Sequence, residues 1–125
     1  MAVKVVDASA LAAVLFGEPE GEVVVGRLKG AGLVAPALLH FELANVCLMK
    51  MRRHPLDRVK LHAAFQLLAH MDVRTVDVDH LAVLELGEQT GLTAYDASYL
   101  WLTRRLDAEL VTLDRKLEAA WTAPL

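Results

Sequence analysis

Three aspartates stand at places in the sequence where carboxylates from distant segments can meet. Asp7 follows the valine-rich segment 3–6, Asp114 follows the mostly apolar segment 110–113, and Asp96 lies near the start of a predicted helix. In an open parallel sheet, functional groups gather at the carboxyl ends of the strands. We therefore expect these three carboxylates to share one edge of a sheet.

Glu42 differs from the aspartates because it lies in the middle of a long apolar segment. At helical spacing its neighbours are Leu39, Val46 and Met49, so we expect its face of the helix to be buried. A helix interior offers no cap, and no Lys or Arg lies within one turn. A buried, unpaired carboxylate costs several kcal/mol. These observations predict that a cation binds Glu42.

Together these acids predict a metal-dependent chemistry. Converging carboxylates form an oxygen-lined pocket that suits Mg²⁺, with Mn²⁺ as a substitute. A cation in such a pocket can activate water, orient it in line with a phosphorus atom and stabilise the leaving oxygen. We therefore predict catalytic and metal-binding roles for four residues: Asp7, Glu42, Asp96 and Asp114. Ser9 and Thr112 can support them by hydrogen-bonding a carboxylate or a bound water.

A structural interpretation of the same residues also stands. Aspartate is a favoured helix N-cap, and the segment from Thr93 to Asp96 fits a capping box. Capping alone would explain Asp7, Asp96 and Asp114. The hydroxyls of Ser9 and Thr112 likewise suit local turns or caps.

The elements that must position these residues alternate between strands and helices. The pattern predicts strands over residues 3–6, 33–35 and 109–112, and a strand or extended connector over 72–78. It predicts helices over residues 8–16, 20–29, 37–53, 56–70, 79–90, 93–106 and 115–121. Crossovers of this length imply a parallel sheet covered by helices on both faces.

Composition limits the class of protein further. The chain has 125 residues, 55% of them hydrophobic and 23% charged, which predicts one globular domain over residues 1–125. The apolar run at 10–16 is far below the roughly 18 residues of a membrane helix. Asp7 interrupts any signal-peptide core, so we expect a cytoplasmic protein without membrane association.

Other chemistries find little support in the sequence. The single cysteine, Cys47, excludes an internal disulfide, and we expect it to be a small buried side chain. The five histidines lack the spacing of a zinc motif. The net charge of -3 argues against a protein that coats nucleic acid. Any contact with nucleic acid must therefore come from a local patch.

At this point the sequence resembles the PIN domain, and more narrowly the VapC-type toxins of toxin-antitoxin pairs. The resemblance runs over nearly the full length and rests on four segments in order: VVDASAL at 5–11, APAL at 35–38 leading to ELAN at 42–45, LTAYDASY at 92–99, and LVTLDRKL at 110–117. Each segment alone is a weak signal. The four in this order form a specific signature.

The resemblance implies a PIN-like three-layer α/β sandwich with a central parallel sheet of four or five short strands. It implies metal-dependent cleavage of single-stranded RNA, with Asp7, Glu42, Asp96 and Asp114 matching the family's acidic positions and Ser9 and Thr112 its polar companions. It further implies a homodimer that a small cognate antitoxin inhibits. Residues 121–125 replace the last strand of many relatives, which leaves the fifth strand open. The alternative is a PIN-like fold that acts as a non-catalytic binding or regulatory partner.

Two groups of basic residues are candidates for phosphate contacts beside the pocket. One comprises Arg52, Arg53, Arg58 and Lys60, and the other Arg104, Arg105, Arg115 and Lys116. Either group can equally be a solvated surface at helix ends. For Tyr99 and Trp101 we favour core or dimer contacts over base stacking. The high apolar content of the helices over 38–51 and 95–106 predicts the homodimer.

Overall fold

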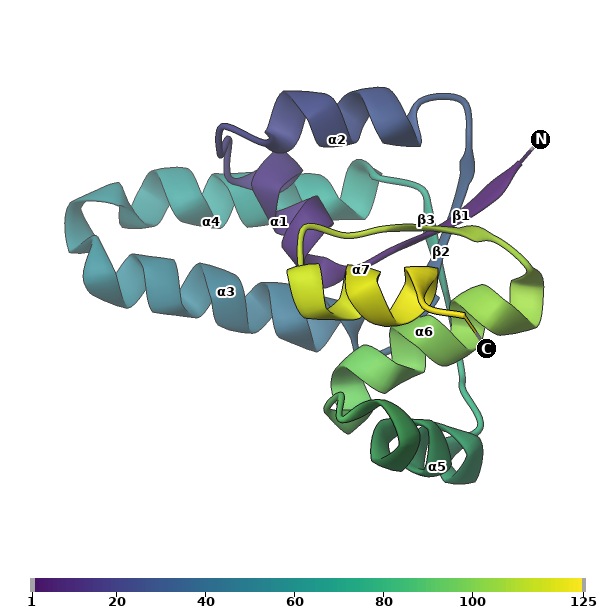
Figure 1. The fold of residues 1–125 in the computed structure, drawn as a ribbon. Helices are drawn as coiled ribbons and strands as arrows, with labels where there is room; N and C mark the ends of the chain where they lie inside the picture. Colours follow the sequence, from purple (N-terminus) through teal and green to yellow (C-terminus); the bar gives the residue numbers. More distant parts are fainter. Residues whose placement is uncertain (1, 125) are drawn as a thin grey trace.

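The computed structural model describes residues 2–124, in which helices and strands alternate along the chain (Figure 1). The strands are β1 (Val3–Val6), β2 (Gly32–Pro36), β3 (Val73–Val76) and β4 (Glu109–Val111). The α-helices are α1 (Ala8–Leu15), α2 (Gly21–Leu28), α3 (Leu39–Arg53), α4 (Arg58–Gln66), α5 (His80–Thr90), α6 (Ala94–Leu106) and α7 (Arg115–Thr122). No helix within residues 2–124 is long and apolar enough to cross a bilayer.

The strands form one parallel sheet in the order β3-β2-β1-β4. Val5 of β1 pairs in register with Val34 of β2 and Leu110 of β4, which places β1 inside the sheet. Val5 and Val6 are fully buried, as expected for a parallel strand covered on both faces. Within residues 2–124 the sheet has four strands, so no fifth strand follows α7.

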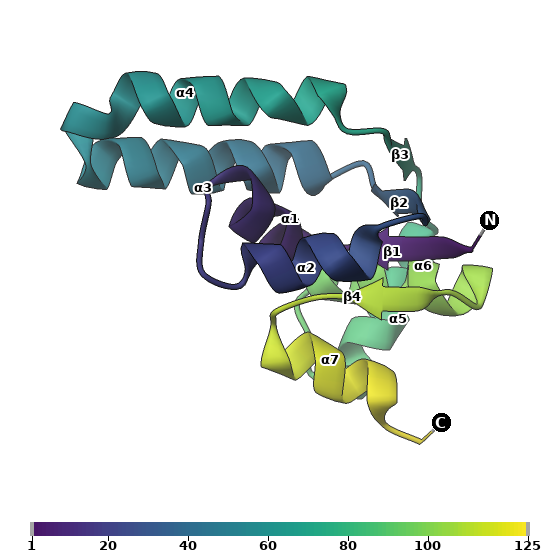
Figure 2. The same ribbon diagram turned by 90° about the horizontal axis from the view of Figure 1, so that it is seen from above.

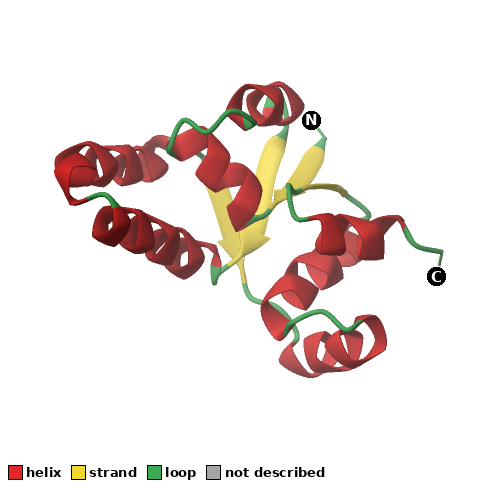
Figure 3. Ribbon diagram, turned by 60° about the vertical axis from the view of Figure 1, so that its left-hand side comes forward, coloured by secondary structure: helices red, strands yellow, loops and turns green. Residues whose placement is uncertain are grey.

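Helices cover both faces of the sheet and give the predicted three-layer α/β sandwich. Figure 3 shows α1 to α4 on one side of the strands and α5, α6 and α7 on the other. The helix α6 lies against β1, β2 and β4, and its buried Tyr99, Leu100 and Thr103 belong to the core. Gly91 ends α5 with a φ of 74°, which a residue with a side chain rarely adopts.

Two predicted elements differ from those observed. The predicted helix over 56–70 is wrong as a single helix, because 3-10 turns at Pro55–Asp57 and Leu67–His70 flank α4. Proline fixes φ and favours the first turn of a helix, and the tighter last turn buries Leu68 while Leu67 stays exposed. The segment over 72–78, left between strand and connector, contains β3, which pairs with β2.

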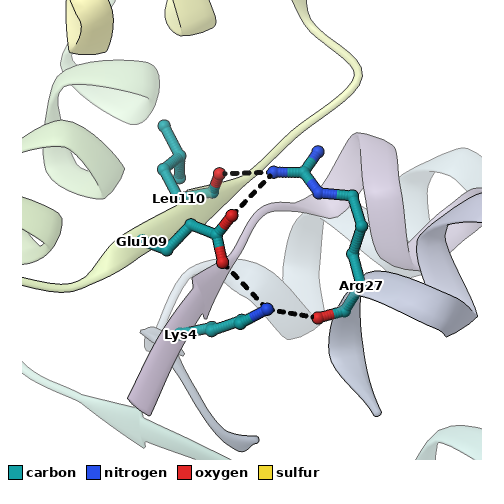
Figure 4. A network of polar contacts seen from close by, with 4 residues as sticks. All are labelled: Lys4, Arg27, Glu109 and Leu110. Carbon is teal, nitrogen blue, oxygen red and sulfur yellow. Dashed lines mark hydrogen bonds and ion pairs between the residues drawn. The ribbon is translucent and has the colours of Figure 1, made fainter. Parts of the chain in front are cut away.

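A polar network ties the edge strand β4 to its neighbours at the end of the sheet where β1 begins (Figure 4). The Lys4 ammonium lies 2.8 Å from the Glu109 carboxylate and donates a 2.6 Å hydrogen bond to the Arg27 carbonyl. The Arg27 guanidinium lies 3.5 Å from Glu109 and donates to the Leu110 carbonyl. The hydrogen bond from Lys4 is the main cause that lowers the pKa of Glu109. This network joins β1, α2 and β4.

The helices α3 and α4 form an antiparallel hairpin that extends beyond the rest of the molecule. Figures 1 and 2 both show the two helices side by side, with the connection at residues 54–57 at the far end. In the last turn of α3, toward the far end of the hairpin, the Lys50 ammonium lies 2.9 Å from the Glu18 carboxylate and 5.7 Å from the centre of the Phe16 ring. The opposite end of α3 lies at the carboxyl edge of the sheet.

Candidate active site

The four predicted acids line one pocket at the carboxyl edge of the sheet. The pocket has a volume of about 300 Å³ and is lined by Asp7, Ala8, Ser9, Glu42, Asn45, Val46, Asp96, Tyr99 and Asp114. The residues come from the end of β1, from α1, α3 and α6, and from the residue that caps α7. The fold therefore brings together side chains that are more than one hundred positions apart in the sequence.

Asp7 sits deepest in this pocket and accepts three hydrogen bonds. Its Oδ1 accepts from the Ser9 hydroxyl at 2.7 Å and from the Ala10 N–H at 3.0 Å, which caps α1. Its Oδ2 accepts from the Thr112 hydroxyl at 2.6 Å. Burial, the largest effect, raises the pKa of Asp7; these hydrogen bonds oppose it, and the nearby Asp114 charge adds to it. One of its roughly four lone-pair positions stays free for a ligand.

Ser9 and Thr112 join the ends of β1 and β4 around this carboxylate. The Ser9 hydroxyl accepts a hydrogen bond from the Leu113 N–H at 2.9 Å, and the Thr112 hydroxyl accepts one from the Asp114 N–H at 3.0 Å. Both hydroxyls thus stabilise the local turn and donate to Asp7 at the same time. The two interpretations of these residues, as turn hydroxyls and as carboxylate partners, therefore both apply, because each hydroxyl makes both kinds of contact.

Asp96 and Asp114 lie at the N-terminal ends of two helices. The Thr93 hydroxyl caps α6 by accepting from the Asp96 N–H at 3.1 Å, and the Asp96 carboxylate lines the pocket. The Asp114 carboxylate caps α7 by accepting from the Leu117 N–H at 2.9 Å and lines the same pocket. Burial and then the Asp114 charge raise the pKa of Asp96, against the opposing effect of Lys116. Asp114 therefore both caps a helix and lines the pocket, whereas α6 is capped by the Thr93 hydroxyl and not by the Asp96 carboxylate.

The expectation that Glu42 lies on a buried face is met in part, and the expectation that it has no partner is wrong. Leu39 on the same face is fully buried, but Met49 is 50% exposed and Glu42 itself is half-buried. The Tyr99 hydroxyl donates a 2.6 Å hydrogen bond to Glu42 Oε1. Burial raises the pKa of Glu42, as do the charges of Asp96 and Asp7, while the bond from Tyr99 lowers it. A residue 57 positions away supplies a partner that helical spacing cannot reveal.

Sequence reasoning missed two residues of the pocket. Tyr99 is 1% exposed, in line with the expected core position, but its hydroxyl reaches the pocket and touches Glu42. Burial, and then the hydrogen bond to Glu42, raise the pKa of Tyr99 well above its ordinary value. Asn45 lines the pocket one helical turn after Glu42. The i, i+3 spacing of Glu42 with Asn45, and of Asp96 with Tyr99, is the signal that could have found both.

The donor chemistry of the pocket fits a hydrated hard cation. Within residues 2–124, no three His, Cys, Asp or Glu side chains are arranged so that they could together hold a metal ion. Mg²⁺ usually keeps several waters and uses only one or two protein carboxylates. A pocket of about 300 Å³ with carboxylates around it has room for an ion with its waters. The residues therefore suit a water-rich ion better than an all-protein cage.

The structure shows that the two groups of basic residues lie at different distances from the pocket. The charge of Lys116 acts to lower the pKa of Asp96, so Lys116 lies near the pocket. The Lys116 ammonium also donates a hydrogen bond to the Gly91 carbonyl at 2.9 Å. Arg104 and Arg105 line a different pocket with Trp101, between α5 and α6. The group from Arg52 to Lys60 lies at the tip of the α3–α4 hairpin and not beside the acidic pocket, so of the two open interpretations phosphate contacts beside the pocket do not apply to it.

The fold and the acidic pocket define a three-layer α/β protein with a carboxylate site at the end of its parallel sheet. The family model of the PIN domain matches residues 4–120, so the chain belongs to the PIN domain family. A comparison with curated proteins gives no match.

Two similar solved structures extend this result. PAE2754 from Pyrobaculum aerophilum is 28% identical, with a TM-score of 0.77, over 100% of this chain and 91% of that one. VapC20 from Mycobacterium tuberculosis, described as a sarcin-ricin loop cleaving toxin, is 16% identical, with a TM-score of 0.68, over 98% of both chains. At 16% identity, the similarity to VapC20 shows a shared fold and nothing beyond it.

Proposed function

We propose that this protein is a metal-dependent endoribonuclease that hydrolyses single-stranded regions of RNA. The observation that carries the proposal is the convergence of four carboxylates on one pocket at the carboxyl edge of a PIN-domain sheet. The description of VapC20 as a toxin that cleaves the sarcin-ricin loop supports RNA as the class of substrate.

The residues of the pocket divide the work of holding a cation and a phosphodiester. A bound Mg²⁺ or Mn²⁺ would lower the pKa of a coordinated water and offset the charge of the phosphate. Asp7, Glu42, Asp96 and Asp114 would hold the ion directly or through its waters. Ser9 and Thr112 fix both oxygens of Asp7, and Tyr99 fixes Glu42, so these carboxylates keep one orientation.

The same carboxylates explain why the reaction would require a cation. Four negative groups around one pocket repel the phosphate of an RNA chain. Raised pKa values at Asp7, Glu42 and Asp96 reflect burial and mutual repulsion in the metal-free protein. A divalent cation removes both problems, because it neutralises the acids and attracts the phosphate.

We further propose that the protein is the toxin of a VapBC-type pair and works in the cytoplasm as a homodimer under control of a small cognate antitoxin. The hairpin helices support a protein partner, because α3 exposes large apolar side chains at Phe41, Leu48 and Met49. An apolar groove of about 240 Å³, which includes Cys47 and Phe65, lies between the same helices. Light scattering should give the mass of a dimer, and a monomer at micromolar concentration would contradict this part of the proposal.

A pair of aspartates that both cap helices provides the test of the pocket. Asp7 caps α1 inside the pocket, whereas Asp79 caps α5 through the Ala82 N–H at 3.0 Å and does not line the pocket. We expect Asp7→Asn to abolish Mn²⁺-dependent cleavage of a single-stranded RNA and Asp79→Asn to leave it unchanged. Circular dichroism verifies that both variants fold.

Two outcomes would contradict the proposal. Equal activity of Asp7→Asn and wild type would leave Asp7 with a capping role only. Wild-type protein that binds RNA but cleaves none, with either metal, would favour the non-catalytic binding partner instead.

A further inference from the structure

The tip of the α3–α4 hairpin, residues 52–60, is a concentrated positive patch, which we call the basic tip. It contains Arg52, Arg53, Arg58 and Lys60 against one acid, Asp57. All nine of its residues are exposed. Across residues 2–124, no ion pair within 4.0 Å involves any of these four basic side chains. The patch is therefore free to bind an anion.

Helix stability explains only half of these charges. Arg52 and Arg53 lie in the last turn of α3, where positive charge favours the helix dipole. Arg58 and Lys60 lie in the first turn of α4, where the N-cap residue Asp57 is the one acidic group beside them. Positive charge at a helix N-terminus is unfavourable, by roughly 0.3–1 kcal/mol for each charge. The single charge of Asp57 cannot offset both, so the helix dipole does not explain why these two basic residues are present.

The remaining charges of the protein favour such a patch as a place that attracts a polyanionic substrate. The chain carries a net charge of -3, and its pocket is lined by four carboxylates. Lys4, Arg27 and Lys50 are engaged with Glu109 or Glu18. Within the described residues 2–124, ten of the thirteen Lys and Arg residues remain, and four of these ten lie together in the basic tip. The basic tip therefore supplies a large share of the positive charge that can attract RNA at long range.

The position of the basic tip fixes how an RNA would use it. Glu42 and Arg53 lie on the same helix, α3, eleven residues apart, which is about 16 Å at 1.5 Å per residue. Consecutive phosphates of a stacked strand advance about 3.4 Å. A strand that crosses the pocket and follows the hairpin would therefore reach the basic tip after about five nucleotides.

We propose that the basic tip is a second RNA-binding site, which holds backbone phosphates about five nucleotides from the bond that the acidic pocket cleaves. This proposal rests on the ribonuclease function proposed above. It makes substrate length, rather than base identity, the property that the basic tip recognises, because phosphate contacts carry no sequence information.

Paired substitutions of equal charge test the basic tip. One variant combines Arg58→Gln with Lys60→Gln, a second combines Arg52→Gln with Arg53→Gln, and the control combines Arg104→Gln with Arg105→Gln at the exposed end of α6. The Arg58 and Lys60 pair is safe for folding, since removing these charges should leave thermal stability unchanged or slightly higher. Glutamine also keeps a good helix propensity.

Fluorescence anisotropy in EDTA measures binding of a 20-nucleotide RNA without cleavage, over a series of salt concentrations. We expect both tip variants to bind more weakly, with the slope of log affinity against log salt reduced by up to about 1.4, or 0.7 per lost contact. With Mn²⁺ present, both should raise KM for this RNA and leave cleavage of a four-nucleotide RNA unchanged. The control should match wild type in both assays.

The outcomes separate this proposal from the ribonuclease function. Unchanged affinity and slope in the tip variants would overturn the second site, including the cases in which an acidic protein or a second copy of the chain covers the tip. An equal loss in the control would also overturn it, as a general charge effect. Failure of wild type to cleave either RNA would instead overturn the ribonuclease function.

Discussion

The hydrogen bond between Tyr99 and Glu42 is the contact in the pocket whose removal has the most defined consequence. Tyr99→Phe deletes one oxygen and keeps the ring, which is 1% exposed and part of the core. The 2.6 Å bond to Glu42 is then lost. A hydrogen bond to a charged group contributes about 1.5–3 kcal/mol. Because Glu42 is half-buried, water can replace part of the lost hydrogen bond. We therefore expect Tyr99→Phe to lower the free energy of unfolding by about 1–2 kcal/mol.

The pH dependence of this loss carries a definite sign. The bond from Tyr99 lowers the pKa of Glu42 against the effect of burial, so it favours the ionised carboxylate. Removing it raises that pKa further. The loss of stability should therefore be full above the pKa of Glu42 and should shrink as pH falls and the carboxyl group is protonated.

Urea unfolding of the metal-free protein at pH 7.5 and pH 4 provides the assay. The chain has two tyrosines, and Tyr95, on the same helix but 65% exposed, gives the matched control Tyr95→Phe. We expect Tyr95→Phe to change the free energy of unfolding by less than about 0.5 kcal/mol. Equal effects of the two substitutions at pH 7.5, or a larger loss for Tyr99→Phe at pH 4, would refute the reasoning.

The remaining predictions concern the charge of the pocket. Glu42→Gln should leave the metal-free protein as stable as wild type or slightly more stable, yet lose the rise in melting temperature that wild type gains from Mn²⁺; an unchanged rise by calorimetry would remove Glu42 from the site. The pKa values of Asp7, Glu42 and Asp96 are higher in the folded protein than in the unfolded chain, where they lie near 4. Protonation of these groups therefore stabilises the fold fully below about pH 4, and this contribution is lost as pH rises through their pKa values in the folded protein. Thermal melts of the protein in EDTA should show this loss of stability as pH rises above about 4, and added Mn²⁺ should offset it. Equal pH profiles of wild type and Asp7→Asn would contradict this prediction.

Much of the framework was predictable because it follows from local chemistry. The segment 3–6, which contains three valines, forms β1, and Asp7 both follows that strand and caps α1. Parallel pairing then places Asp7 and Asp114 at one edge, since both follow strands that pair in register. The convergence of the carboxylates is therefore a consequence of topology.

The contacts between distant side chains were not predictable from spacing. Tyr99 reaches Glu42 only because α6 and α3 meet at the carboxyl edge of the sheet, and a buried tyrosine in an apolar helix looks like an ordinary core residue. The placement of Arg58 and Lys60 likewise depends on the direction of the α3–α4 hairpin, which points the turn away from the pocket. A cluster of basic residues at a helix end is compatible with a position beside the pocket and with a position far from it.

The central claim is that the carboxylate pocket hydrolyses RNA with the help of a divalent cation. Its most direct test is the cleavage rate of a labelled single-stranded RNA by one preparation of wild-type protein, measured as purified, after EDTA, and after titration with Mg²⁺ or Mn²⁺. We predict that EDTA abolishes cleavage, that the rate returns and saturates with added cation, and that Asp96→Asn stays inactive throughout. Cleavage that persists in EDTA, or that Asp96→Asn retains, would contradict the account.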